Sequence, residues 1–141
     1  AQTNYQNRLS LSNPRSIAEY YMERLRHEKQ EQTMALLFDA KCRLLDDVTL
    51  TVGSATAAFV SPREIFLAAL SCGAVQLVLV HNHPSGDATP SAEDDIATKR
   101  VAECGNILGI PLVDHIIVGD RTYYSYRECK RIIYKGENND E

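Results

Sequence analysis

The chain has 141 residues, 44% of them hydrophobic, which is enough to build one domain with its own core. Its formal net charge is −4, and this acidic balance argues against binding along the phosphate backbone of a nucleic acid. The apolar runs are too short to cross a membrane, and the first residues lack the pattern of a signal peptide.

The predicted elements alternate between helices and strands along the chain. Amphipathic segments that open with capping residues predict three α-helices: Asn13 to about Lys29, Ser61 to about Cys72, and Ser91 to about Leu108. Apolar or alternating runs predict five β-strands: 33–40, 48–52, 75–80, 110–119 and 122–126. The polar segment 1–11 and the acidic tail 135–141 are expected to be flexible, which leaves 12–134 as the folded domain.

Capping residues set the predicted helix boundaries. Asn13 and Ser61 each precede a proline, as an N-cap residue often does. Ser61 and Glu64 also match a capping box, in which the glutamate side chain reaches back to the helix start. Gly73 and Gly109 follow the second and third helices and are expected to end them.

The order of elements favours an α/β (α+β) fold. Strands separated by a helix favour parallel pairing, whereas hairpins add antiparallel pairs. We therefore expect a mixed β-sheet flanked by helices on both faces. Ligands of such sheets bind beyond the carboxyl ends of the strands, and His81 follows strand 75–80 at such an end.

The four cysteines, Cys42, Cys72, Cys104 and Cys129, lie far apart in the sequence. Their spacing does not match a Cys-x-x-Cys zinc site and argues against a disulfide framework. We therefore expect reduced thiols in a cytoplasmic protein.

The stretch HNHPSGDATPSAED, residues 81–94, gathers two histidines, turn-forming residues and acids. On an extended segment His81 and His83 point to the same side, where two imidazoles can bind one Zn²⁺. A catalytic zinc needs a third protein ligand, and Asp94, in the first turn of the next helix, can supply it. Asp95 points about 100° further round that helix and is the weaker candidate. Two other interpretations stay open: a polar strand end for the histidines, and a helix-capping pair for Ser91 and Asp94.

Taken together, these residues resemble a known signature. The order His-x-His, proline and Ser-x-x-Asp within HNHPSGDATPSAED looks like the JAMM (MPN-type) metalloprotease motif. With PREIF upstream and DHIIVG downstream, the chain resembles the RadC family from about Ser12 to Cys129. The resemblance implies a JAMM fold, which is similar to that of cytidine deaminases, with a metal site at the joined motifs.

The family pattern implies specific ligands and a general base. It assigns a zinc cofactor to His81, His83 and Asp94, with a water in the fourth position. In JAMM enzymes a glutamate at the start of the strand after the first helix acts as the base, and Glu31 matches that place. Glu28, one helical turn earlier, is the second choice.

The remaining polar residues of these motifs have roles in the same pattern or in the fold. The family pattern makes Ser91 a hydrogen-bond donor to the oxyanion. Ser85 is expected to stabilise the turn after the histidines. His115 is expected to be a buried, hydrogen-bonded histidine, with a contact to Asp94 or to substrate as the alternative. His27 is expected on the surface.

The resemblance implies a zinc-dependent hydrolase that cuts a peptide or isopeptide bond, in a family nominally linked to DNA repair. A protein or peptide substrate is then the expected partner, and membrane binding is not expected. Two alternatives stay open: a metal-dependent nuclease or phosphoesterase of DNA metabolism, and a non-catalytic metal-binding interaction module.

Direct DNA binding is not supported by the charge. A cluster of basic residues near the end of the chain is most simply a solvated tail: Arg121, Arg127, Lys130, Arg131 and Lys135. Fuller RadC proteins resemble a two-part chain with a helix-hairpin-helix segment ahead of this domain. That pattern is not found in this sequence, which weakens the expectation of a role on DNA itself.

Overall fold

The computed structural model describes residues 11, 13–52 and 60–132, so the end segments predicted to be flexible fall almost wholly outside the described residues. Within these ranges the elements follow one another as predicted: α2 (Pro14–Leu25), β1 (Gln32–Phe38), β2 (Leu44–Val52), α3 (Pro62–Cys72), β3 (Gln76–Asn82), α4 (Ala92–Leu108), β4 (Leu112–Val118) and β5 (Tyr123–Ser125). Among the described residues, no helix is both long and apolar enough to cross a bilayer.

The strands form one mixed sheet in the order β2-β1-β3-β4-β5. β1 pairs antiparallel with both β2 and β3, and β5 pairs antiparallel with β4. β3 and β4 are parallel and are joined through α4, which is the crossover that parallel neighbours require. The mixed sheet predicted from the order of elements is confirmed.

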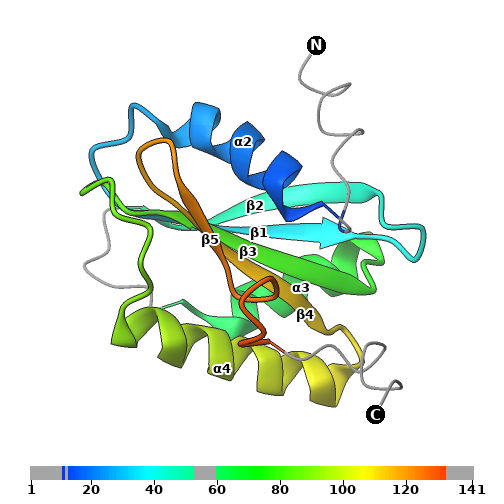
Figure 1. Cartoon of the computed structure of the whole chain (residues 1–141). Helices are drawn as coiled ribbons and strands as arrows, with labels where there is room; N and C mark the ends of the chain where they lie inside the picture. The colour runs from blue at the N-terminus through cyan, green and yellow to red at the C-terminus, as the bar shows by residue number, and fades with distance from the viewer. Residues whose placement is uncertain (1–10, 12, 53–59, 133–141) are drawn as a thin grey trace.

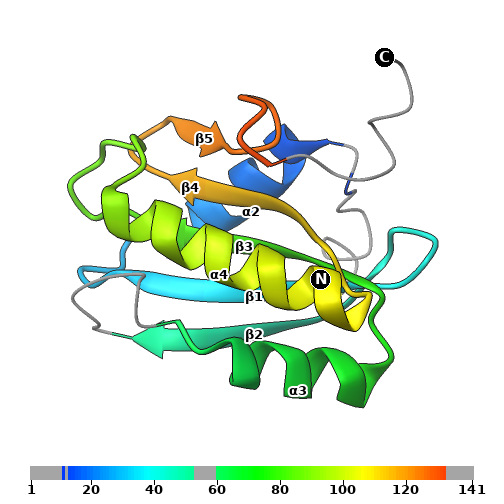
Figure 2. The ribbon, with the colours of Figure 1, turned by 90° about the horizontal axis from the view of Figure 1, so that it is seen from below.

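Helices cover both faces of this sheet. Figure 1 shows α2 on one face and α3 with α4 on the other, and Figure 2 gives a view onto the α3–α4 face. Every residue of β3 is buried, and its side chains alternate between the two layers. Val80 packs in the cluster that contains Ile17 of α2, whereas Leu79 packs in the cluster that contains Val101 of α4. By this alternation His81 falls on the α3–α4 face.

Helix α2 ends at Leu25, before the predicted end at Lys29. Its apolar stripe, Ile17, Tyr21 and Leu25, is buried, whereas residues 26–30 are all exposed. Because that segment has no further apolar residue to bury, nothing holds it as a continued helix against the sheet. The chain instead turns towards β1.

Helix α3 begins at Pro62 with Ser61 at the N-cap position, as predicted, but the capping box predicted for Ser61 and Glu64 is wrong. Within the described residues, the Ser61 side chain makes no capping hydrogen bond. Pro62 occupies the first helical position and has no N–H, so one donor fewer needs a partner there. Gly73 and Gly109 end α3 and α4 in the left-handed conformation, with φ of 75° and 73°, as predicted.

Strand β2 begins at Leu44, earlier than the predicted segment 48–52. Asp46 and Asp47 interrupt the apolar alternation at its start. Asp47 accepts a hydrogen bond from the Tyr21 hydroxyl of α2 (2.7 Å), so a polar contact links the start of this strand to α2. A pattern based on hydrophobicity cannot find such a segment.

Candidate metal centre

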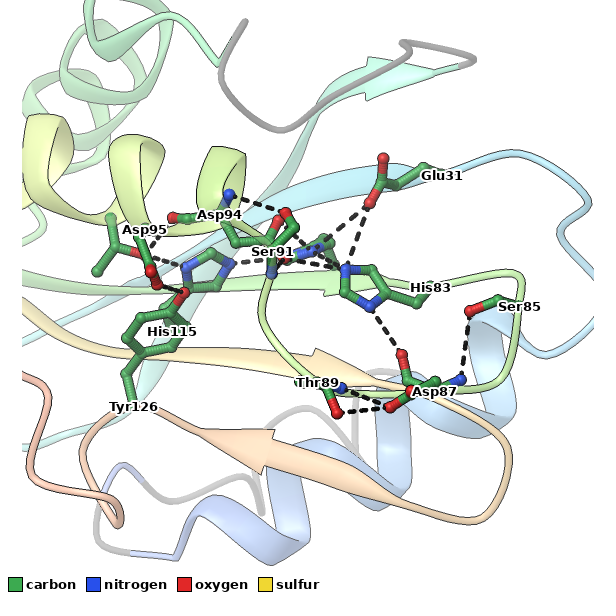
Figure 3. Close-up of polar contacts among 12 residues, drawn as sticks. Glu31, His83, Ser85, Asp87, Thr89, Ser91, Asp94, Asp95, His115 and Tyr126 are labelled. Atoms are coloured by element: carbon green, nitrogen blue, oxygen red, sulfur yellow. Dashed lines mark hydrogen bonds and ion pairs between the residues drawn. The ribbon is translucent and has the colours of Figure 1, made fainter.

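The ends of β1 and β3 bring the predicted residues together. The two strands run antiparallel, and Thr33 of β1 lies opposite His81 of β3. Because side chains alternate along a strand, Glu31 and His83 fall on the same face as that pair. Figure 3 shows Glu31, His83 and Asp94 pointing towards one another.

Four side chains direct possible ligand atoms into one cluster: Glu31, His81, His83 and Asp94, whose ligand atoms all lie within 4.8 Å of one another. The two histidine Nε2 atoms are 3.0 Å apart. His81 Nε2 lies 2.9 Å from Asp94 Oδ1, and His83 Nε2 lies 3.0 Å from Asp94 Oδ2. Glu31 Oε1 is 3.6 Å from both Nε2 atoms. His81 and Asp94 are buried, whereas the side chains of His83 and Glu31 are 14% and 20% exposed, so the cluster opens to solvent on their side.

The first turn of α4 folds Asp94 back over the strand end through a reciprocal capping box. Ser91 Oγ accepts a hydrogen bond from the Asp94 N–H (3.1 Å), and Asp94 Oδ2 accepts one from the Ser91 N–H (2.8 Å). The capping interpretation is confirmed. It does not exclude a ligand role, because both carboxylate oxygens also face the histidines. Ser91 uses an oxygen lone pair in the cap, so its hydroxyl hydrogen can be donated to another group.

A chain of hydrogen bonds through the core sets the tautomer of His81. The Thr98 hydroxyl donates its one hydrogen to the Asp94 backbone carbonyl (2.8 Å), so it acts as an acceptor towards His115 Nδ1 (2.5 Å). His115 therefore carries its proton on Nδ1 and accepts at Nε2 from the His81 Nδ1–H (2.8 Å). His81 Nε2 is left with a lone pair, and this lone pair faces the cluster.

The loop after β3 sets the tautomer of His83 in the same way. The His83 Nδ1–H donates to the Asp87 carbonyl (2.8 Å), so Nε2 again presents a lone pair to the cluster. The Asp87 carboxylate accepts hydrogen bonds from the N–H (2.9 Å) and hydroxyl (2.7 Å) of Thr89. Ser85 Oγ accepts from the Asp87 N–H (3.3 Å), which matches the turn role predicted for it. These contacts are drawn in Figure 3.

The cluster therefore consists of acceptors: two imidazole lone pairs and carboxylate oxygens. Acceptors packed 2.9–3.6 Å apart repel one another unless a proton or a cation lies between them. Around a tetrahedral zinc with bonds of about 2.0–2.1 Å, ligand atoms lie about 3.3 Å apart, which falls inside this range. The residues present thus fit a divalent metal that accepts imidazole and carboxylate ligands.

A buried hydroxyl next to the cluster gives a second indication of a ligand. Thr33 stands opposite His81, is 1% exposed, and its Oγ1 has no hydrogen-bond partner among the described residues. Leaving a buried hydroxyl unpaired costs about 1–3 kcal/mol. A water or ligand group held at this end of the sheet would remove that cost.

The pKa values of the cluster are shifted by burial and by its own charges. When protons, not a cation, lie between Asp94 and the two rings, burial opposes ionisation of Asp94, but the hydrogen bonds with His81 and His83 outweigh burial and hold the Asp94 pKa well below its usual range. The hydrogen bond with Asp94 raises the pKa of His83. Burial raises the pKa of Glu31, and the two nearby imidazoles reduce that rise. The site thus pairs a carboxylate that stays ionised with one that takes up a proton more readily.

His115 lies in the core behind His81. Tyr126 stacks on its ring, with centroids 5.0 Å apart and planes 8° from parallel. Burial, together with the nearby His81, holds the His115 pKa well below its usual range, so the ring is neutral. The prediction of a buried, hydrogen-bonded histidine is confirmed. Its direct contact is with His81, and it reaches Asp94 only through Thr98.

Asp114 anchors the strand that carries His115. Its carboxylate accepts hydrogen bonds from the Ser125 hydroxyl (2.6 Å) and from the backbone N–H groups of His115 (2.7 Å) and Arg127 (3.0 Å). Burial raises the pKa of Asp114 to about 6, against the lowering effect of these bonds. The contacts tie β4 to β5 and to the turn that follows.

Two glycines let the loop after His83 pack against the end of β4. A Cβ on Gly119 would lie 2.3 Å from the Gly86 carbonyl oxygen, so a larger residue does not fit there. Gly86 has a φ of 91°, which favours glycine. The His83 N–H donates to the Val118 carbonyl (2.9 Å), and the Asp120 N–H donates to the Gly86 carbonyl (2.8 Å). The motifs HNHPSG and DHIIVG therefore meet in space.

The other candidates from the sequence lie outside the cluster. Glu28 is exposed, and the structure brings Glu31, not Glu28, to the histidines. Asp95 pairs with Arg131, away from the other ligand atoms. His27 is exposed, as predicted.

The sequence patterns did not predict the supporting role of two residues. Thr98 lies four residues after Asp94, and this helical spacing places both on one face of α4, a signal that could have been used. Asn82 stands between the two histidines. Because side chains alternate along a strand, it lies on the opposite face of the sheet from them, and its spacing to the ligands does not indicate a role in the site.

Comparison with known protein families gives a match over most of the chain. A family described as the RadC-like JAB domain matches residues 11–131. The chain belongs to the RadC family. Its mixed sheet with helices on both faces is consistent with the JAB/MPN fold that the resemblance implied.

Relatives of this RadC chain include proteins named UPF0758. Those of Bacillus cereus (strain B4264) and Geobacillus sp. (strain WCH70) are each 44% identical over 124 residues, which is 88% of this chain and 55% of theirs. That of Clostridioides difficile (strain 630) is 42% identical over 118 residues, which is 84% of this chain and 50% of its own. The chain spans about half the length of these relatives.

Proposed function

We propose that this RadC-family protein is a zinc-dependent hydrolase of the JAMM type that cuts a peptide or isopeptide bond. The observation that carries the proposal is the cluster of acceptors at the open end of the sheet. His81, His83 and Asp94 are the ligand types of a catalytic zinc site, which keeps one position open. Glu31 lies on the solvent side of the same cluster, where a proton carrier is needed.

The roles divide between holding the metal and moving a proton. His81, His83 and Asp94 would hold the zinc. The chemistry supplied by zinc, when bound, is polarisation of a water, whose pKa falls towards neutrality. Glu31 would take a proton from the attacking water and pass it to the leaving amine. Its Oε1 lies 3.6 Å from the Nε2 atoms of both histidines, which places it within reach of the water that it would deprotonate.

Ser91 would stabilise the oxyanion of the tetrahedral intermediate. Its Oγ accepts the capping bond from Asp94, which leaves the hydroxyl hydrogen for a substrate oxygen. Ser91 also stands at the start of α4, where the unpaired N–H groups of the first turn carry partial positive charge. Capping and catalysis are therefore compatible in one residue.

A peptide or isopeptide substrate suits this set of groups better than a phosphodiester. Sites that cleave phosphodiesters often hold two metals with further carboxylates. The described residues contain one cluster of metal-ligating groups. Two basic residues near the end are also engaged within the protein: Arg131 pairs with Asp95, and Arg127 donates to the Leu11 carbonyl (3.0 Å). We propose a protein or peptide partner on these grounds.

We further propose that the protein works in the cytoplasm. Its four cysteines are free thiols, which suits a reducing compartment. A link to DNA repair, which the family resemblance suggests, would then run through a protein substrate rather than through direct contact with DNA.

The test is cleavage of a fluorogenic peptide library by the zinc-loaded protein, with Glu31→Gln beside the parent. We expect cleavage by the parent, zinc in both proteins, and a rate at least about a hundredfold lower in the variant, the scale of a lost general base. Zinc loss in Glu31→Gln would instead make Glu31 a ligand. A zinc-loaded parent that cleaves no peptide or isopeptide would contradict the proposed activity.

A further inference from the structure

Asn82, the residue between the two histidines, bonds the backbone on both sides of Glu31. Its amide oxygen accepts a hydrogen bond from the Gln32 N–H (2.6 Å), and its amide nitrogen donates to the Gln30 carbonyl (3.2 Å). The residue is 5% exposed. Its own backbone belongs to β3, where it pairs with Val118 of β4, so the side chain starts from a fixed position.

These two bonds replace a missing step of the sheet. The ladder between β1 and β3 ends at the pair Thr33 and His81. One residue further on, a primary amide offers one acceptor and one donor, which is what a backbone residue offers in an antiparallel ladder. Asn82 thereby continues the pairing to the two peptide groups that flank Glu31.

Glu31 needs such an anchor because of where it stands in the chain. It lies before Gln32, the first residue of β1, and it follows the exposed segment 26–30. Its carboxylate must nevertheless reach the histidines, at 3.6 Å from each Nε2. A shift of about 1 Å in a proton-carrying group is enough to lower a rate strongly.

We propose that Asn82 is the positioning residue that holds Glu31 over the metal site. The inference rests on the proposed function, in which Glu31 handles the proton. Asn82 acts from the other face of the strand and through the backbone. One residue of the His-Asn-His segment thus sets the base while its two neighbours bind the metal.

Gln76 offers a matched control at the other end of the same strand pair. It is the first residue of β3, it is 9% exposed, and its side-chain amide donates to the Asp39 carbonyl just beyond β1 (2.9 Å). Gln76→Ala therefore removes a buried amide-to-backbone bond of the same kind. Gln76 is far from Glu31, because it pairs with Phe38 at one end of the β1–β3 ladder, whereas Glu31 lies beyond the other end, where Thr33 pairs with His81.

The first readout is hydrogen exchange of the Gln32 backbone amide, measured by NMR on the metal-free protein. Asn82 Oδ1 is the acceptor that protects this amide. We expect exchange at least about tenfold faster in Asn82→Ala and unchanged in Gln76→Ala, since only the first variant opens this bond. Equal protection in parent and Asn82→Ala would overturn the assigned contact.

The second readout is the zinc dissociation constant, measured by competition with a chelating dye. Glu31 adds a negative charge beside the cluster, so Glu31→Gln is expected to weaken zinc binding about tenfold without abolishing it. Asn82→Ala should weaken it by a similar factor, and the double variant should be no weaker than Glu31→Gln alone. Gln76→Ala should bind as the parent does. Additive losses in the double variant would mean that Asn82 does not act through Glu31.

A second variant keeps the test decisive if Asn82→Ala does not fold. Asn82→Asp retains the acceptor for Gln32 and loses only the donor to Gln30. The repulsion between its added charge and the Glu31 carboxylate is lost in Glu31→Gln, so this variant is read by hydrogen exchange alone. Because Asn82→Asp keeps the acceptor, the Gln32 amide should stay as protected as in the parent, and exchange as fast as expected for a lost bond would overturn the assigned contact. Neither readout uses a substrate. A parent that binds zinc but cleaves no peptide would therefore refute the proposed function and leave the role of Asn82 standing.

Discussion

His81 and His83 present the same atom to the same cluster, but different parts of the molecule hold them. His81 is buried. Its Nδ1–H begins a chain of hydrogen bonds that runs through His115 and Thr98 into the core between α4 and β4. His83 is partly exposed, and its Nδ1–H bonds to a carbonyl of the loop, that of Asp87. One half of the site belongs to the core and the other half to a loop.

This difference teaches how the site can be both rigid and accessible. The core half fixes a tautomer with groups that no solvent reaches, so its geometry is set when the domain folds. The loop half stays next to solvent, and backbone hydrogen bonds to the end of β4 and the turn after it hold the loop in place. The open side of the site therefore lies over the loop half, beside His83 and Glu31. Four predictions test this division, in order of decreasing effect.

The largest contrast is expected between His81→Ala and His83→Ala. Both should lose zinc, because each removes a ligand. His81→Ala should also lower the free energy of unfolding of the metal-free protein by about 3 kcal/mol, because it opens a cavity and leaves His115 Nε2 unpaired in the core. His83→Ala should cost under about 1 kcal/mol, as partly exposed sites do. Urea unfolding with elemental analysis measures both. Equal costs would remove the distinction between core and loop halves.

Gly119→Ala tests the loop half. The added Cβ would meet the Gly86 carbonyl oxygen at 2.3 Å, so the loop that carries His83 must move. We expect a loss of about 3 kcal/mol in unfolding free energy together with weaker zinc binding. Gly109→Ala is the control: Gly109 has a φ of 73°, which strains an alanine, but a Cβ there meets no atom within 4 Å. It should cost about 1 kcal/mol and leave zinc affinity unchanged.

Ser91→Ala separates the cap from the proposed chemistry. The cap supplied by Ser91 Oγ should contribute about 1 kcal/mol to stability. Zinc should stay bound, and turnover of a cleaved peptide should fall roughly a hundredfold, the scale of one lost oxyanion donor. Asn13→Ala removes the side-chain cap of α2 and serves as the control, with a similar stability loss and normal turnover. If Ser91→Ala and Asn13→Ala turn over equally fast, Ser91 is only a cap.

The smallest effect is a pH dependence in the core half. Burial raises the folded-state pKa of Asp114 to about 6, above its unfolded value of about 3.9. A group with a raised folded pKa stabilises below its unfolded pKa, and that stability is lost as pH rises through the folded pKa. Between pH 4 and pH 7 the parent should therefore lose on the order of 2 kcal/mol relative to Asp114→Asn. A constant difference between the two proteins across this range would show that Asp114 does not titrate there.

Much of the fold could be predicted because burial leaves periodic patterns in the sequence. Strand 75–80 was visible as an apolar run, and the glycines at 73 and 109 marked two helix ends. The end of α2 and the start of β2 were predicted less well. Residues 26–30 have helix-forming types but nothing to pack against, and Asp46 with Asp47 carry polar contacts that hydrophobicity does not register.

The candidate site was predictable where its residues follow one another at fixed spacing. His81, His83 and Asp94 share one segment, and alternation along the strand with the helix start predicts that they converge. Glu31 comes from another strand, and only the family resemblance pointed to it. The contacts of Asn82 with the backbone around Glu31 depend on the register between β1 and β3, which local patterns do not encode.

The most direct test of the account is the metal content of the protein, purified without chelator and without a His tag, with Asp94→Asn beside it. Asp94→Asn keeps an oxygen for the helix cap but removes the charge that faces both histidines. Elemental analysis after incubation with zinc and desalting should give close to one zinc per parent chain and little in the variant. Equal metal content in the two proteins, or none in either, would contradict the assignment of His81, His83 and Asp94 as a metal centre.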